Sequence, residues 1–432
     1  MSDQMRIPSG KRVLLTLLGL GVTFITAFVG PTSPAAAAEY DLYSTTYLSL
    51  YDRDQAVGED QQFISLYEYL SLDLWELSGP EWSFHLYGWG RKDLGDDTDD
   101  DGAGGSLSSA YAQYSHPEGK RYQLKAGRFY LTEGTASETL DGVFTRGRHT
   151  SGLGGAVFGG RPVENSVSSD EEGDLLAGGR ISYVLEGFAE LGLGYLTEEG
   201  DFNGDDRREV GGDLWLRPAE GIEIVGRGLY NLATSGMASY RLAARFGPLP
   251  SLDLLVGGEG YRYGDLFQSS LNSAFGFSIL DPDDEVTAVF ADLDWRFNGR
   301  SALRAGIRNI RHDRSDPGDA NRGELGVRFT LEGFLDGLGL SAAVQTADLP
   351  ENEYSQVRGY ALKSMGNWTF SLDALTQSYE EEISGEDTVL QVVGSAGRRF
   401  SGDLKLSGDI RYTESPNFEE DLAVLVRAEV GL

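Results

Sequence analysis

The chain has 432 residues, a formal net charge of -32 and 58 glycines, and it contains no cysteine. The absence of cysteine excludes disulfides, thiolate metal sites, covalent haem attachment through a Cys-x-x-Cys-His motif and a lipoprotein anchor. The acidity disfavours nucleic-acid binding, because phosphate groups would be repelled. The 20 Phe and 21 Tyr residues among so many glycines are typical of many short strands, in which only alternate positions need be apolar. A soluble acidic protein is the alternative, and it leaves this aromatic content unexplained.

The first 38 residues have the features of a secretory signal peptide. Arg6, Lys11 and Arg12 precede an apolar run at 13–29, and the segment ends in four alanines. A basic start, an apolar centre and an Ala-x-Ala end predict cleavage after Ala38. An uncleaved membrane anchor is the alternative, but the Ala-rich end favours cleavage. We therefore expect a signal peptide at 1–38 and one domain at 39–432.

From about Tyr40 onward, short turns alternate with long acidic loops. Short turns recur, for example at 78–80, 218–221 and 298–300, and the segments between them alternate apolar and polar residues. This arrangement predicts an all-β fold, a transmembrane antiparallel up-and-down β-barrel with short periplasmic turns and long outer loops. The tryptophans support it, because Trp75, Trp82, Trp215, Trp295 and Trp368 lie near predicted short turns, where an aromatic girdle is expected.

One acidic loop has the start of a calcium-binding pattern. Asp97, Asp99 and Asp101 alternate and are followed by Gly102, as in a D-x-D-x-D-G loop. Alternate carboxylates can then point at one hard cation, and the glycine permits the sharp turn. The twelfth position is Ser108 and not glutamate, so the pattern is incomplete. The sequence otherwise indicates no cofactor, and a solvated acidic loop is the alternative to a Ca²⁺ site.

The segment 121–149 concentrates positive charge in an otherwise acidic chain, and we interpret it as a pore constriction. It resembles a feature of outer-membrane porins, in which a Gly-Arg at a strand end precedes an inward loop bearing an Asp-Gly; the matching residues are Gly127-Arg128 and Asp141-Gly142. We expect the small residues at 152–160 to fold inward. Basic groups opposite lumen carboxylates would produce a transverse field that filters ions, whereas simple pairing with acidic strand neighbours is the alternative. The predicted constriction residues are Arg121, Lys125, Arg128, Asp141, Arg146 and Arg148.

The segment 286–311 predicts a specific hairpin register. Its odd-numbered residues are apolar on both sides of Asn298-Gly299, and its even-numbered residues are mostly charged. Opposite residues must share a face, so paired numbers must sum to an even value. A three-residue loop, Asn298 to Arg300, satisfies this condition. It places Asp294 opposite Arg304, with Asp292 diagonal to Arg304 and Arg308, and predicts an ion-paired ladder on the lumen wall.

The number of strands depends on the segment 134–160. Two strands there give a total of 22, and a loop gives 20, and both are even as single-chain bacterial barrels require. The last segment, 422–432, resembles the C-terminal assembly signal of outer-membrane barrels, although it ends in Leu where many end in an aromatic residue. An exported chain with repeated amphipathic strands resembles Gram-negative outer-membrane porins, and the resemblance implies location in the outer membrane, in contact with its lipid.

A barrel of this size cannot be filled by its own side chains, so its lumen holds water, a plug or a partner. We expect a monomeric or homotrimeric porin or channel that passes small solutes or ions. A barrel that sheathes a multihaem cytochrome, as in porin–cytochrome conduits, is the second hypothesis, and a structural or adhesive barrel is the third. The four histidines lack catalytic or metal-ligand spacing, so we do not expect an enzyme.

Overall fold

The computed structural model describes residues 39–431 apart from 56–60, 96–102, 117–121, 166–169, 173–174, 200–205, 268–282, 314–317, 401–402 and 417. The predicted signal peptide lies outside the described residues and stays a prediction. Within the described part, no helix is long and apolar enough to cross a membrane.

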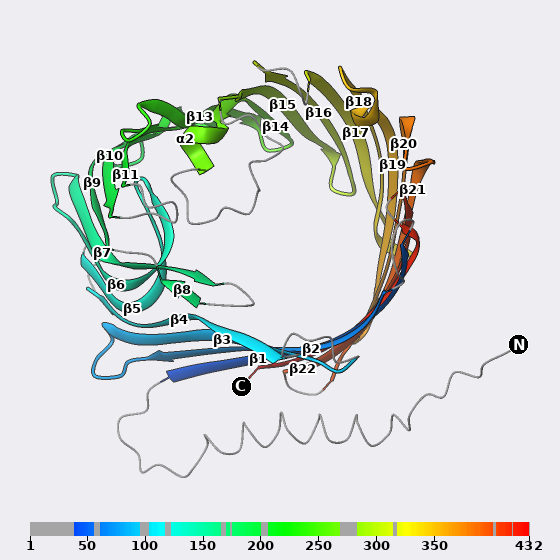
Figure 1. Ribbon diagram of the computed structural model, residues 1–432, viewed down its shortest axis with the longest axis horizontal. Coiled ribbons are helices and arrows are strands. Elements are labelled where there is room, and N and C mark those ends of the chain that lie inside the picture. Colours follow the sequence, from blue (N-terminus) through cyan, green and yellow to red (C-terminus); the bar gives the residue numbers. More distant parts are fainter. Residues whose placement is uncertain are drawn as a thin grey trace, which may run out of the picture. The chain divides into compact units, whose positions relative to one another are not determined.

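The described residues form a closed antiparallel barrel. Each wall strand pairs with its neighbours in sequence, and β1 closes the ring by pairing with β23 from Tyr43 opposite Gly431 onward. Of the 23 strands, β8 pairs only with the last three residues of β7, 163–165. This leaves 22 strands in the wall. Figure 1 shows the wall strands as a ring around a lumen, with the short helix α2 on the inner side. The predicted all-β barrel is confirmed at its larger strand count.

The elements are β1 (Glu39–Gln55), β2 (Gln61–Trp75), β3 (Trp82–Asp93), β4 (Ala103–Ser115), β5 (Tyr122–Glu133), β6 (Ala136–Arg148), β7 (Leu153–Asn165), β8 (Asp170–Glu172), β9 (Leu176–Leu185), β10 (Ala189–Glu198), β11 (Arg207–Ala219), β12 (Ile222–Asn231), β13 (Gly236–Leu249), β14 (Leu252–Arg262), α2 (Tyr263–Phe267), β15 (Glu285–Asn298), β16 (Ser301–His312), β17 (Ala320–Leu331), β18 (Leu335–Ala347), η1 (Pro350–Asn352), β19 (Tyr354–Met365), β20 (Trp368–Ile383), β21 (Glu386–Arg399), β22 (Leu404–Ser415) and β23 (Phe418–Gly431).

Large apolar side chains are exposed on one face of the wall. Leu193, Ile307 and Leu372 are examples, each more than half exposed. Exposed apolar residues at alternate positions all round a closed barrel face lipid, and the other parity lines the lumen. Trp82 and Trp368 are also exposed beside short turns, as expected for a girdle at the membrane interface.

The β15–β16 hairpin has the predicted pairing with a different turn. Asp294 lies opposite Arg304, and the even sum holds along the ladder up to Arg296 and Ala302. The ladder then shifts by one residue, so that Asn298 lies opposite Ser301. The predicted three-residue loop is therefore a shorter turn preceded by a β-bulge, and the extra residue of the bulge keeps apolar residues on one face.

The inward element of the barrel is the tip of the β5–β6 hairpin. The β4–β5 ladder ends at Ala110 opposite Arg128, and the β6–β7 ladder ends at Leu140 opposite Pro162. Between these points β5 and β6 pair only with each other, as far as Glu133 opposite Ala136. We call residues 129–140 the lumen arm. Its tip touches the inner wall, since a Cβ on Gly134 would lie 3.3 Å from the Cβ of Arg180 on β9.

Glycines allow the arm to leave the wall. Gly127 has a φ of +123°, and a Cβ there would lie 2.3 Å from the carbonyl oxygen of Ala110. A Cβ on Gly142 would lie 2.2 Å from the carbonyl oxygen of Gly159. Only glycine fits backbones that approach so closely. The expectation that 152–160 folds inward is wrong: residues 153–160 belong to β7 in the wall and pair with β6 and β9.

Candidate functional site

The lumen arm is fixed to the wall by a hydrophobic core inside the barrel. Phe129 and Leu140 of the arm are fully buried, and they pack with side chains of the inner wall that would otherwise face water. The cluster also explains why apolar residues occupy the lumen face of β7, β9 and β10. Its members are Phe129, Leu131, Ala136, Leu140, Phe144, Ala156, Phe158, Leu176 and Leu196.

A buried arginine holds the arm from β11. Arg207 donates two hydrogen bonds to Glu209, at 3.0 and 3.1 Å, and one of 2.8 Å to Glu138 of the arm. A carboxylate oxygen of Glu198 lies 3.5 Å from the same guanidinium. Arg207, Glu198 and Glu209 are all buried. The bidentate pair with Glu209 fixes the guanidinium on β11. Its charge-assisted bond to Glu138 then ties the arm to this wall strand.

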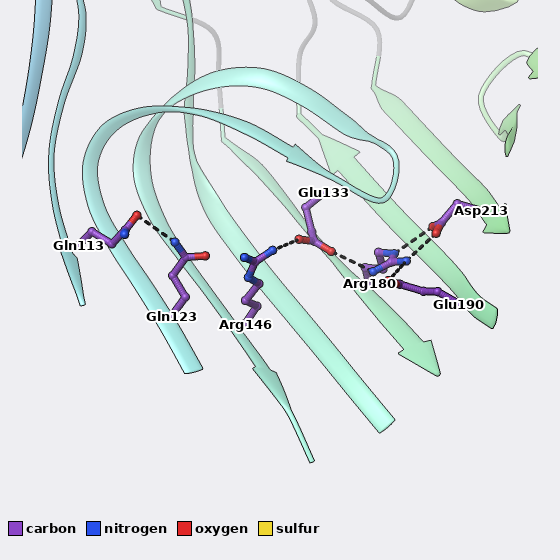
Figure 2. Close-up of polar contacts among 7 residues, drawn as sticks. All are labelled: Gln113, Gln123, Glu133, Arg146, Arg180, Glu190 and Asp213. Atoms are coloured by element: carbon purple, nitrogen blue, oxygen red, sulfur yellow. Dashed lines mark hydrogen bonds and ion pairs between the residues drawn. The ribbon is translucent and has the colours of Figure 1, made fainter. Parts of the chain in front are cut away.

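A second arginine cluster lies at the tip of the arm. Figure 2 shows a row in which Glu133 stands between Arg146 and Arg180, with Asp213 and Glu190 on the far side of Arg180. Arg180 lies 3.3 Å from Glu133, 2.9 Å from Glu190 and 2.5 Å from Asp213. The three carboxylates come from the arm, β10 and β11, so one guanidinium joins the arm to two wall strands.

A cavity of about 420 Å³ opens beside this cluster, on the lumen face of the wall. Arg146 and Arg148 project into it from alternate positions of β6. Arg146 is half exposed, and its nearest carboxylate, that of Glu133, is 3.9 Å away. Arg148 is exposed and makes no ion pair with any residue in the described part of the chain. The opposite side of the cavity carries Glu186 and Glu190.

Of the other predicted constriction residues, Lys125, Arg128 and Asp141 do not line this cavity. Arg128 binds Asp141 through two hydrogen bonds of 2.8 and 2.7 Å, and it also donates to the carbonyl oxygen of Leu107 on β4. This pair has the parity of Tyr130 and not of Phe129, so it lies on the side of the arm turned away from the core, where it stabilises the bend. Lys125 lies over the ring of Tyr111, 5.1 Å from its centroid. Arg121 lies outside the described residues.

The predicted lumen-wall residues lie on the far side of the ring from the arm. Asp294 and Arg304 are opposite each other, as predicted, and both line a cavity of about 310 Å³. The predicted ladder of ion pairs is wrong in its partners, because Arg308 binds Glu259 of β14 at 2.5 Å. Asp292 lies opposite Gly306, diagonal to Arg304 and Arg308 as the predicted register requires. Long side chains reach across strands, so backbone register alone does not determine which charges meet.

One polar trio was missed from the sequence. His85 hydrogen-bonds to Asp73 through Nδ1, and its Nε2 lies 2.9 Å from the hydroxyl of Ser83. Asp73 is directly opposite His85 across β2 and β3, so register brings the two together. The order Ser-His-Asp is that of a nucleophilic triad. However, Ser83 is buried, and the backbone of β3 is paired on both sides, so its N–H groups cannot form an oxyanion hole.

The predicted calcium ligands Asp97, Asp99 and Asp101 lie outside the described residues, and a Ca²⁺ site there stays a prediction. Among the residues that the structure does describe, no group of three or more histidine or acidic side chains could hold a metal ion.

Comparisons with known proteins identify the fold. No family model and no curated protein matches the chain. The translocation pore of the P pilus usher PapC is similar in structure, with a TM-score of 0.54 and 10% identity over 90% of this chain and 99% of that one. OccD3 of Pseudomonas aeruginosa matches with a TM-score of 0.45 and 13% identity, over 95% and 97% of the two chains. OccAB2 of Acinetobacter baumannii matches with 0.47 and 10%, over 91% and 98%.

The likeness to the usher pore shows a shared fold, a closed antiparallel β-barrel. The closed barrel and its apolar outer face place this chain in the outer membrane, in contact with lipid.

Proposed function

We propose that the protein is a passive channel through which small hydrophilic solutes or ions cross the outer membrane past the lumen arm. The single observation that carries this proposal is that the arm is fixed inside the lumen by its own core and by the clusters around Arg180 and Arg207. A barrel of 22 strands is too wide for its side chains to close. An ordered inward element narrows such a pore without sealing it and brings charged groups close to a passing solute.

A barrel that sheathes a multihaem cytochrome is the alternative that the sequence left open. The arm favours the open channel, because it takes up lumen volume that an inserted partner would need. The charged groups around the arm also disfavour a purely structural or adhesive barrel, because such a barrel needs no charged constriction.

Planar-bilayer recording tests the channel. We expect discrete conductance steps from the mature protein, and larger steps from a variant in which residues 130–139 are replaced by a short glycine turn, because the passage widens. A matched control shortens the β20–β21 hairpin from its tip at Ser384-Gly385 by the same net number of residues, and its step size should equal that of the unaltered protein. Absence of steps in the unaltered protein, or equal steps after removal of the arm, would contradict the proposal.

Assembly is measured separately. The sequence leaves a monomer and a homotrimer open, and a homotrimer predicts three copies per particle by light scattering of the detergent-solubilised protein, after correction for bound detergent. A mass of one copy would leave the channel proposal intact, because the arm, its core and its arginine clusters all belong to a single chain.

A further inference from the structure

The cavity beside the lumen arm has charges of opposite sign on its two sides. Arg146 and Arg148 stand on β6, and Glu186 and Glu190 stand on the turn and strand that follow β9. Ser182 of β9 adds a hydroxyl between them. A solute lying along this line meets guanidinium groups at one end and carboxylates at the other.

The basic side is available to a ligand. Arg148 has no ion-pair partner in the described part of the chain, and the contact of Arg146 with Glu133 is too long for a hydrogen bond at 3.9 Å. The Arg146 side chain is half exposed, and Arg148 is exposed. A guanidinium presents a planar fork of donors that matches a carboxylate, and two of them at adjacent lumen positions can grip one anionic group.

The acidic side of the cavity has more carboxylates than guanidinium partners. Glu133 lies between Arg146 and Arg180, and Arg180 also binds Glu190 and Asp213, so two carboxylates of β10 and β11 share one guanidinium. Glu186, on the exposed turn at the rim of the cavity, makes no ion pair with any described residue. The surplus carboxylates would repel a simple anion and attract an ammonium group. Neither a pure anion nor a pure cation satisfies both sides.

We propose that this cavity is a binding subsite for small zwitterionic solutes, of the class of amino acids and short peptides. The carboxylate of the solute lies against Arg146 and Arg148, and its ammonium group lies towards Glu186 and Glu190. The volume of about 420 Å³ accommodates a solute of this size. The proposal rests on the proposed channel function for its physiological meaning, because the solute reaches the subsite through the lumen.

Calorimetric titration of the detergent-solubilised barrel tests the subsite without requiring transport. Glycylglycine is the zwitterionic probe, and succinate is the probe with anionic groups alone. We expect saturable binding of glycylglycine and clearly weaker binding of succinate. The double variant Arg146→Gln/Arg148→Gln should lose about tenfold or more of the affinity for glycylglycine, since a hydrogen bond to a charged group contributes at least that factor. Glu186→Gln should weaken glycylglycine and strengthen succinate.

The control is Arg304→Gln, which removes one positive charge from the opposite wall, where Arg304 lines a different cavity. It should bind glycylglycine as the unaltered protein does. No saturable binding, equal affinity in the double variant, or succinate binding as tightly as glycylglycine would overturn the proposal. Because binding and conductance are measured separately, missing binding with normal conductance refutes the subsite alone, and saturable binding without conductance refutes the channel alone.

Discussion

The two sides of the lumen deal with charge in opposite ways. From β13 to β23 most ion pairs of the inner wall are at least partly exposed and join neighbouring strands, such as Arg358 with Asp373 at 2.8 Å and Lys405 with Glu429 at 3.1 Å. From β5 to β11 the arm covers the wall, and the arginine–glutamate cluster around Arg207 is buried with an apolar core beside it. Arg358 is 55% exposed, whereas Arg207 is 6% exposed.

The difference shows what each set of charges can do. Exposed pairs on a wet wall contribute about 0–1 kcal/mol each, because water competes for the same groups. They keep the wall hydrophilic, and the backbone hydrogen bonds of the sheet determine the path of the chain there. A buried cluster is different, because loss of one partner leaves desolvated charges behind and costs about 3–5 kcal/mol. The buried cluster therefore holds the arm in place, and the exposed ion pairs line the passage.

The largest effect is expected from Arg207→Met. The substitution removes the guanidinium shared by Glu138, Glu198 and Glu209. The free energy that keeps the arm docked should fall by about 3–5 kcal/mol. Hydrogen–deuterium exchange of the amides in 129–140 measures this opening. Unchanged protection of the arm would show that the core alone holds it.

The second largest loss of arm-docking free energy is expected from Phe129→Ala. Phe129 is fully buried at the centre of the core beneath the arm. Truncation of a buried phenylalanine costs about 3–5 kcal/mol, and the low end applies here because lumen water can enter the space. The same exchange experiment should show faster exchange in the arm, with the amides of β15 to β23 unaffected. Leu193→Ala, at a lipid-facing position, is the matched control and should leave the arm protected. Faster exchange spread evenly over the barrel would argue against a local core.

The smallest effect is expected from Arg358→Gln on the exposed wall. The change breaks the pair with Asp373 and should reduce the free energy of unfolding by no more than about 1 kcal/mol. Denaturant titration of the barrel in vesicles measures it, and the difference should shrink further at high salt. A loss as large as that of Arg207→Met would remove the distinction between the two sides.

The sequence by itself determined the class of the fold and much of its local order. Alternation along each segment identified strands with one lipid face and one lumen face, and parity alone placed Asp294 opposite Arg304. These properties are local, because side chains of a strand point alternately to its two faces and a short turn fixes the register.

The tertiary structure decided where the chain departs from the wall and which charges meet. Phe129, Phe144 and Phe158 alternate as any wall residues would, and their apolar character on the lumen face was the available signal that something covers them. The residues that fix the arm, Glu133, Glu138, Arg180 and Arg207, come from strands far apart in sequence, and nothing in their local spacing pairs them. An inward bend of the β5–β6 hairpin near Gly127 and Gly142 brings them together, because beyond Arg128 and Leu140 the hairpin has no wall partner and turns its core face onto β9 and β10.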